Sequence, residues 1–178
     1  MLIESKRMET LNEKIKSFHS NLKEAGSSAS SELYLGKTSI SCSQVSNFQI
    51  AVKAGDHTIK MDEPIESAGD NTAATPVQLF LAAFAGCMEI TWLEICTMHK
   101  LNVSKISINI TSTMDRRFVL AGKAPISPRL ISLLIIFRFE TTEKLDTLKK
   151  YLKKVEQFCP VGASLHPDIE KIYKFEAM

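Results

Sequence analysis

Hydrophobic and polar positions along the first third of the chain change from a helical to an extended pattern. Apolar residues recur every three or four positions over residues 11–25, which predicts an amphipathic helix with Thr10 and Glu13 as its capping box. Gly26 and the serines that follow it, up to residue 31, predict a flexible joint. We therefore expect residues 1–27 to be a helical appendage that covers a sheet or a partner subunit.

Short alternating runs over residues 38–61 predict an antiparallel meander with one buried face. Gly55 and Asp56 suit a tight hairpin turn. Cys42 is expected to be a buried structural cysteine on one of these strands, and His57 a surface turn residue.

Residues 62–74 are polar and rich in small side chains, which is typical of a loop. Four acidic residues lie here: Asp62, Glu63, Glu66 and Asp70. Their spacing matches no calcium loop and no histidine stands among them, so we interpret them as solvated charge.

The clearest helix signal begins at Thr75, which can cap the helix while Pro76 takes its first turn and Gln78 completes a capping box. Apolar residues then follow on nearly every side, which predicts a helix buried all round. Cys87 lies at its centre. At about 100° per residue, the Cys87 face also carries Phe80, Ala83, Phe84, Thr91 and Glu94, and Cys96 lies opposite.

Gly86 lies directly before Cys87 in this helix. Glycine costs roughly 1 kcal/mol relative to alanine inside a helix, so it predicts that another backbone packs closely beside Cys87.

The C-terminal half predicts two strands, a helix and a last strand. The strands cover residues 103–114 and 129–137, the second a continuous apolar run that should be central in its sheet; an irregular connection over 115–128 joins them. An amphipathic helix over 142–158, capped by Thr142, comes next. Its apolar stripe, which we expect to be buried, consists of Leu145, Leu148, Leu152, Val155 and Phe158. Residues 171–177 form the last strand.

Composition narrows the possible partners. The chain has 178 residues, and its formal net charge is only +2, which does not favour nucleic-acid binding. Charged residues interrupt the N-terminal apolar runs, so we expect no signal peptide and no membrane span, but a cytoplasmic protein. Its four cysteines form no CxxC motif, which leaves a redox thiol pair as an alternative to inert cysteines.

Two of these cysteines, Cys87 and Cys159, are candidates for reactive thiols. Cys87 is either an inert core thiol or a reactive one, and the helix alone favours the inert reading. Cys159 is held at a helix end by Pro160. His166, the histidine nearest to Cys159 in sequence, is interpreted as a solvated loop side chain.

The segment TPVQLFLAAFAGC on a helix, followed by a strand hairpin and a helix that ends in FCPV, resembles the OsmC/Ohr family of thiol-dependent hydroperoxide reductases. The match runs from about Thr38 to the C-terminus. The resemblance implies a single OsmC-like domain over residues 1–178 with an α+β fold, in which antiparallel sheets pack around long central helices. It also implies an intertwined homodimer.

The resemblance further implies a peroxiredoxin-like antioxidant activity on organic hydroperoxides. Cys87 would be the peroxidatic thiol and Cys159 the resolving thiol, with an external thiol reductant and no cofactor or metal. A second thiol protects a sulfenic acid from further oxidation, which suits this pairing.

The chain departs from the best-studied branch, which activates its cysteine with an arginine and a glutamate ten residues earlier. Position 77 is Val77, and no arginine occurs between Arg7 and Arg116. The chain resembles instead the OsmC-like branch that lacks this pair. Lysine, histidine, Arg116 or Arg117 of a partner chain are the substitutes that remain.

Two other functions therefore stay open for the same fold. One is a noncatalytic dimeric module that binds a small apolar ligand in a cleft between helices. The other is a thiol redox sensor that is oxidised without turnover.

Overall fold

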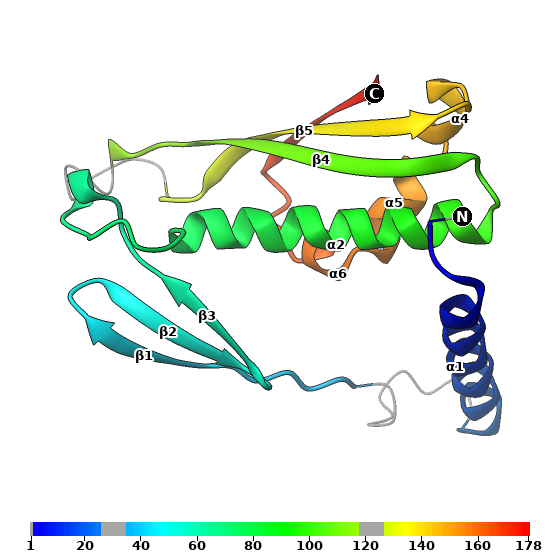
Figure 1. Ribbon diagram of the computed structural model, residues 1–178, viewed down its shortest axis with the longest axis horizontal. Coiled ribbons are helices and arrows are strands. Elements are labelled where there is room, and N and C mark those ends of the chain that lie inside the picture. The colour runs from blue at the N-terminus through cyan, green and yellow to red at the C-terminus, as the bar shows by residue number, and fades with distance from the viewer. Residues whose placement is uncertain (1, 26–34, 118–126) are drawn as a thin grey trace. The chain divides into compact units, whose positions relative to one another are not determined.

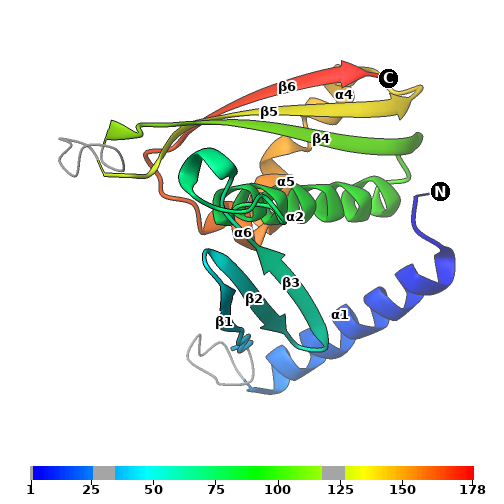
Figure 2. The ribbon, with the colours of Figure 1, turned by 60° about the vertical axis from the view of Figure 1, so that its left-hand side comes forward.

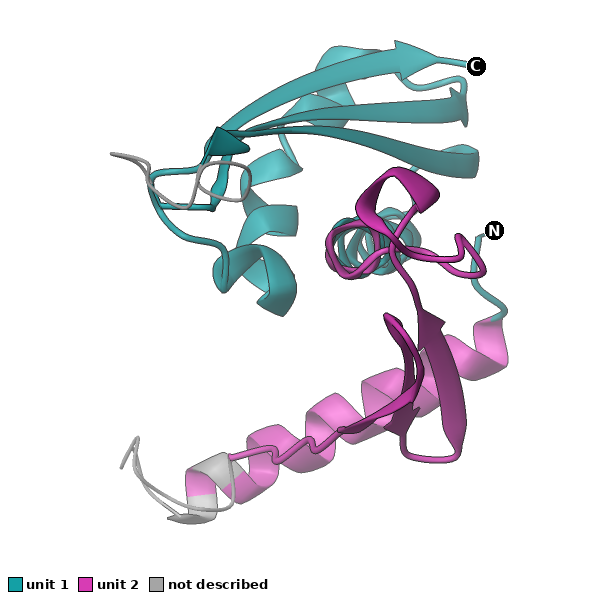
Figure 3. Ribbon diagram, turned by 90° about the vertical axis from the view of Figure 1, so that its left-hand side faces the viewer, with its two compact units in different colours: residues 1–4, 81–178 teal, residues 5–80 magenta. Residues whose placement is uncertain are grey.

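The computed structural model describes residues 2–25, 35–117 and 127–178. They form two compact units, Ser5–Phe80 and Met1–Glu4 with Leu81–Met178 (Figure 3), and the boundary lies within the central helix. The single-domain organisation of the chain stays a prediction. The predicted joint at 26–31 and residues 118–126 of the predicted connection lie outside the described residues.

The first helix, α1 (Ser5–Ala25), starts earlier than predicted. The hydroxyl of Thr10 donates a hydrogen bond of 3.1 Å to the carbonyl oxygen of Lys6, one helical turn before it. Thr10 therefore lies inside the helix, and the predicted capping box with Glu13 is wrong.

The predicted meander is confirmed as an antiparallel sheet of β1 (Ser41–Ser46), β2 (Gln49–Ala54) and β3 (His57–Met61), in that order. Its predicted buried face is not found within the described chain, because Val52 is buried but Phe48 is 53% exposed. Ala54 pairs with His57, so Gly55 and Asp56 form a two-residue turn, in which Gly55 takes a φ of 58°. Cys42 is exposed, because β1 is an edge strand that is exposed along its whole length. The prediction that Cys42 is buried is wrong.

Asp62 organises the loop that leads to the central helix. Its carboxylate accepts hydrogen bonds from the amide of Glu63 (2.8 Å) and from the amide and hydroxyl of Thr72 (2.9 and 2.8 Å). These bonds, the Thr72 amide first, lower the pKa of Asp62 below its ordinary value. The side chain is only 1% exposed, so its interpretation as a solvated charge is wrong.

The central helix, α2 (Pro76–Met98), begins with the predicted capping box. The amide of Gln78 donates to the Thr75 hydroxyl (3.2 Å), and the Thr75 amide donates to the side-chain oxygen of Gln78 (2.8 Å). Among the described helices, α2 is long and apolar enough to cross a membrane, a property that core helices of soluble proteins share.

Within the described chain, α2 is buried on one side only. Phe84, Met88, Trp92 and Ile95 are buried, whereas four other apolar side chains of the helix are 41–59% exposed: Val77, Phe80, Ile90 and Met98. The prediction of a helix buried on all sides is therefore wrong for the single chain.

The second sheet has the order β4-β5-β6, with β4 (Val103–Met114), β5 (Leu130–Thr141) and β6 (Glu170–Ala177). The long apolar strand β5 is central, as predicted; it is antiparallel to β4 and parallel to β6 (Figures 1 and 2). The register aligns Ile108, Phe137 and Phe175 across the three strands. Such rows build the apolar face on which α2 packs.

Trp92 joins α2 to this face. Its ring centroid lies 5.6, 5.1 and 6.1 Å from those of Phe137, Phe139 and Phe175, all in edge-on arrangements. Together with the buried side chains around it, this contact sets the height and rotation of α2 over the sheet. The fold is α+β, as predicted.

Three short helices replace the single helix predicted over residues 142–158. They are α4 (Leu145–Lys149), α5 (Leu152–Phe158) and α6 (Pro160–Ala163). Lys144, not Thr142, is the N-cap of α4. Phe158 is 63% exposed rather than part of the buried stripe, because α5 ends there and the chain turns into α6.

Candidate thiol site

Cys87 lies in the middle of α2, half-buried, with its side chain packed in part against the core. The hydroxyl of Thr91 donates a hydrogen bond of 2.9 Å to the Cys87 carbonyl one turn earlier. Helix α2 is anchored at both of these positions, since Met88 and Trp92 beside them are fully buried. The sulfur of Cys87 therefore has a defined place.

Cys159 lies at the junction of α5 and α6, where it is the N-cap of α6. Pro160 takes the first helical position, and the amide of Gly162 donates to the Cys159 Sγ at 3.3 Å. Its side chain is fully buried. The turn that sequence reasoning recognised in Cys159-Pro160 thus points the sulfur into the core.

The two sulfurs are in contact: the Cys159 Sγ donates a hydrogen bond to the Cys87 Sγ over 3.0 Å. Both thiols are free. Since a disulfide bond is about 2.05 Å long, the pair needs to close by only about 1 Å to form one. Two thiols that are 72 residues apart in sequence are thus in contact in the folded chain.

Burial raises the pKa of Cys159 to about 11, and its hydrogen bond to Cys87 adds to this shift. Cys159 is therefore a protonated thiol at neutral pH. It is the donor of the pair and Cys87 is the acceptor, which assigns the two cysteines different roles.

Gly162 leaves room for this contact. A Cβ at this position would lie 3.1 Å from Cε2 of Phe84 and 3.2 Å from the Cys159 Sγ. A larger residue would push apart the groups that position Cys159.

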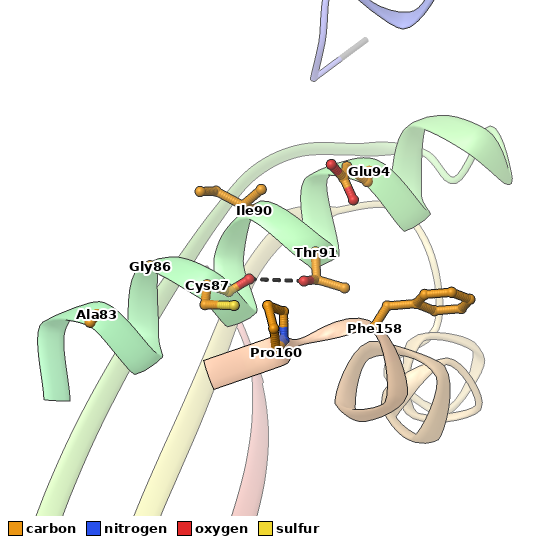
Figure 4. Close-up of a pocket in the computed structure, with 8 residues that line it drawn as sticks. All are labelled: Ala83, Gly86, Cys87, Ile90, Thr91, Glu94, Phe158 and Pro160. Atoms are coloured by element: carbon orange, nitrogen blue, oxygen red, sulfur yellow. Dashed lines mark hydrogen bonds between the residues drawn. The ribbon is translucent and has the colours of Figure 1, made fainter. Parts of the chain in front are cut away.

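A pocket of about 480 Å³ opens beside Cys87 (Figure 4). Helix α2 lines one side, and the segment from α5 to α6 lines the other. The lining residues are Ala83, Gly86, Cys87, Ile90, Thr91, Glu94, Phe158 and Pro160. The predicted shared face is confirmed for Ala83, Cys87, Thr91 and Glu94, which line the pocket together. Phe80 and Phe84, the other residues of the predicted face, do not line it.

Among the described residues that line the pocket, Glu94 is the one with an acidic or basic side chain. None of the described lining residues is lysine, arginine or histidine. Arg117, considered above as a possible cation for the thiol, pairs with Asp115, and this hydrogen-bonded pair lowers the pKa of Asp115 to about 2. His166 is exposed, as predicted, and lies 3.3 Å from Arg129 through its Nε2.

The remaining cysteines are separate from the pair. Cys96 is 1% exposed, and burial, with a smaller contribution from Glu143, raises its pKa to about 12. Cys42 is exposed on β1. Among the residues that the structure describes, no group of three or more His, Cys, Asp or Glu side chains is placed to hold a metal ion.

Sequence reasoning missed Phe158 as a pocket residue. Its place in an apolar helical stripe suggested burial, and only the turn at Cys159 carries it to the pocket rim. The following Pro160 was the one signal in the sequence that the stripe ends there.

An α+β chain in which a central helix and a Cys-Pro turn bring two thiols together defines a class of two-cysteine proteins. The sequence model of the OsmC-like protein family matches residues 69–172, more than half of the chain and both cysteines of the pair. The chain therefore belongs to the OsmC-like protein family. Among curated proteins, none matches the sequence significantly.

Solved structures share the fold at low sequence identity. An OsmC-like protein from Mycoplasma pneumoniae is 13% identical, with a TM-score of 0.70 over 80% of this chain and 98% of its own. A putative osmotic stress induced and detoxification response protein from Psychrobacter arcticus 273-4 is 19% identical, with a TM-score of 0.65 over 80% of this chain and 98% of its own.

An organic hydroperoxide resistance protein OsmC from Legionella pneumophila is 17% identical, with a TM-score of 0.61 over 80% of this chain and 97% of its own. These three structures are covered almost completely, whereas about a fifth of this chain has no counterpart in them.

Proposed function

We propose that this protein is a thiol-dependent peroxidase that reduces organic hydroperoxides. The observation that carries the proposal is the 3.0 Å contact between the sulfurs of Cys87 and Cys159 beside an open, mainly apolar pocket. The fold shared with an organic hydroperoxide resistance protein supports the same substrate class. Apolar walls suit the organic part of such a substrate.

In the first step, the Cys87 thiolate attacks the outer oxygen of the hydroperoxide, ROOH. An S–O bond forms and the O–O bond breaks, so the sulfur is oxidised to a sulfenic acid. The leaving alkoxide takes up a proton and departs as the alcohol ROH.

In the second step, the Cys159 thiol loses its proton and attacks the sulfenic sulfur of Cys87. The S–S bond forms, the S–O bond breaks, and the hydroxyl leaves as water with that proton. An external dithiol then reduces the disulfide and is itself oxidised to a disulfide. The protein needs no other cofactor for this cycle.

Val77 stands where the best-studied branch has the glutamate of its activating pair. The S–H group of Cys159 donates a hydrogen bond to the Cys87 sulfur. The proposed resolving thiol is therefore already in contact with the sulfur that it attacks in the second step.

The proposed peroxidase is a homodimer. Helix α2 exposes Val77, Phe80 and Ile90, and a Cβ on Gly86 would meet no atom of the described chain within 4 Å. Glycine destabilises a helix relative to alanine, and open space beside Gly86 gives no reason for a glycine at this position. Close packing of a second copy against Gly86 would give that reason. The meander exposes apolar side chains of its own, among them Val45 and Phe48, which a second copy would also cover.

A cytoplasmic location fits this cycle. Its resting state needs free thiols, and all four cysteines are free. The cytosol keeps thiols reduced and supplies the external dithiol.

The experiment treats the reduced protein with cumene hydroperoxide and maps its cysteines by mass spectrometry. We expect a disulfide between Cys87 and Cys159 and, with a dithiol present, continuous consumption of the peroxide. Cys87→Ser should lower turnover to the background rate, while Cys96→Ala, a change outside the pair, should retain it. An unoxidised Cys87, or unchanged turnover in Cys87→Ser, would overturn the proposal.

The apolar lining of the pocket also supports the alternative of a noncatalytic module for a small apolar ligand. Reduced cysteines after peroxide treatment, with a copurified ligand in the native mass spectrum, would establish that alternative. A redox sensor would instead form the disulfide once, without turnover in the presence of a dithiol.

A further inference from the structure

Cys87, Thr91 and Glu94 lie on one stripe of α2, at i, i+4 and i+7, and all three line the pocket (Figure 4). Seven residues of α-helix rise about 10 Å, so the carboxylate of Glu94 belongs to the end of the pocket remote from the thiol. Phe158 and Pro160 line the opposite side. The pocket therefore has a reactive end and an acidic end.

Glu94 is the one acidic or basic side chain among the described residues that line this pocket. Its carboxylate makes no ion pair or hydrogen bond with any described residue. An unneutralised carboxylate in an apolar groove produces a field that water screens less than at an open surface.

We propose that Glu94 sets the charge preference of the Cys87 pocket. It selects molecules that carry a cationic or hydrogen-bond-donating group about 10 Å from the atom that meets the thiol. It disfavours molecules with a carboxylate or another anion at that end. In combination with the proposed peroxidase activity, on which this substrate assignment rests, neutral or cationic amphipathic hydroperoxides are preferred to those of free fatty acids.

The test measures charge selectivity at Cys87 without any peroxide. Methanethiosulfonates with a trimethylammonioethyl, a sulfonatoethyl or a methyl group are close chemical analogues that differ in charge. The Cys87 thiolate attacks the sulfenyl sulfur, the new S–S bond forms, and methanesulfinate leaves. A Cys159→Ser background prevents the second thiol from displacing the label.

Rates at Cys87 and at Cys42 are read from the same sample by mass spectrometry. Cys42 is exposed and does not line the pocket, so it is an internal reference for reagent reactivity. The rate with the neutral reagent corrects for any change in the nucleophilicity of Cys87. The measured quantity is the corrected ratio of the cationic to the anionic rate.

We expect Cys87 to favour the cationic reagent, and Glu94→Gln to lower the ratio at least about threefold, as expected for a unit charge at about 10 Å. Glu94→Asp keeps the charge and should retain the preference. Glu89→Gln is the matched control, since Glu89 lies on the same helix but does not line the pocket. Added salt should reduce the ratio for the parent protein more than for Glu94→Gln.

An equal ratio in the parent protein and in Glu94→Gln, with Cys87 labelled in both, would overturn the proposal. An equal fall of this ratio in Glu89→Gln and Glu94→Gln would overturn it as well, because the total charge of the helix would then explain the preference. A fall in the ratio together with no peroxide oxidation of Cys87 would leave Glu94 as the charge determinant and remove only the peroxidase.

Discussion

The two faces of α2 have similar composition but opposite surroundings. The packed face, formed by Met88, Trp92, Ile95 and Cys96, is buried against β4, β5 and β6. The open face, formed by Ala83, Gly86 and Ile90, borders the pocket. Cys87 lies between them, half-buried, with its sulfur against Cys159.

The two cysteines of this helix, Cys96 and Cys87, have thiols in different surroundings. Cys96 is surrounded by core, and burial holds it protonated with a pKa of about 12. Cys87 has a thiol donor on one side and a pocket on the other. A rigid packed face therefore positions the thiol, while the other side of the helix borders a pocket in the described chain.

The largest expected effect comes from weakening the packed face. Trp92→Ala removes the ring that contacts Phe137, Phe139 and Phe175, and we expect it to lower the free energy of unfolding by about 3–5 kcal/mol. Urea denaturation measures this change. Met98→Ala, at a side chain that is 46% exposed, is the control and should change stability by about 0.5 kcal/mol or less. Similar losses in the two variants would contradict the contrast between the faces.

The second effect tests the open face. If a second copy packs against Gly86, Gly86→Leu places a side chain in that contact and should weaken dimerisation by roughly tenfold to a hundredfold, about 1.4–2.8 kcal/mol. Sedimentation equilibrium measures the dissociation constant. A dissociation constant equal to that of the parent protein would show that the open face of α2 is not a close contact between copies.

A smaller effect is expected at Gly162, which lies beside the Cys159 sulfur. Gly162→Ala brings a methyl group to 3.1 Å from Phe84 and 3.2 Å from the Cys159 sulfur. We expect a loss of about 1 kcal/mol in stability and slower formation of the Cys87–Cys159 disulfide after a peroxide pulse. Stopped-flow oxidation with mass-spectrometric mapping separates the two readouts. A stability loss without slower disulfide formation would mean that Gly162 supports packing alone.

The smallest effect concerns the buried thiol of Cys96 at alkaline pH. Its pKa is raised from 9.0 to about 12 in the folded chain, so its contribution to stability is complete below pH 9 and is lost as the pH rises towards 12. Unfolding measured between pH 8 and 10.5 should show a shallower decline in Cys96→Ala than in the parent protein. A steeper decline in the variant would contradict burial as the cause of the shift.

Local patterns predicted most elements of the fold. The Thr75 capping box, the turn at Gly55 and the central position of β5 depend on a few neighbouring residues or on one apolar run, and all three are confirmed. The predictions for the Thr10 capping box and for Cys42 failed because competing interactions or strand position override short motifs.

The sequence by itself determined most of the elements, the family and the two cysteines worth testing, since these depend on local patterns and short motifs. Only the tertiary structure decided that α2 has an open face, that Cys159 meets Cys87 at 3.0 Å, and which described side chains line the pocket with Glu94. The physical reason is that burial, pKa and contact depend on residues far away in the chain. The periodicity of a helix predicts which side chains share a face. The packing of the sheet and the turn at Cys159 determine which residues contact that face.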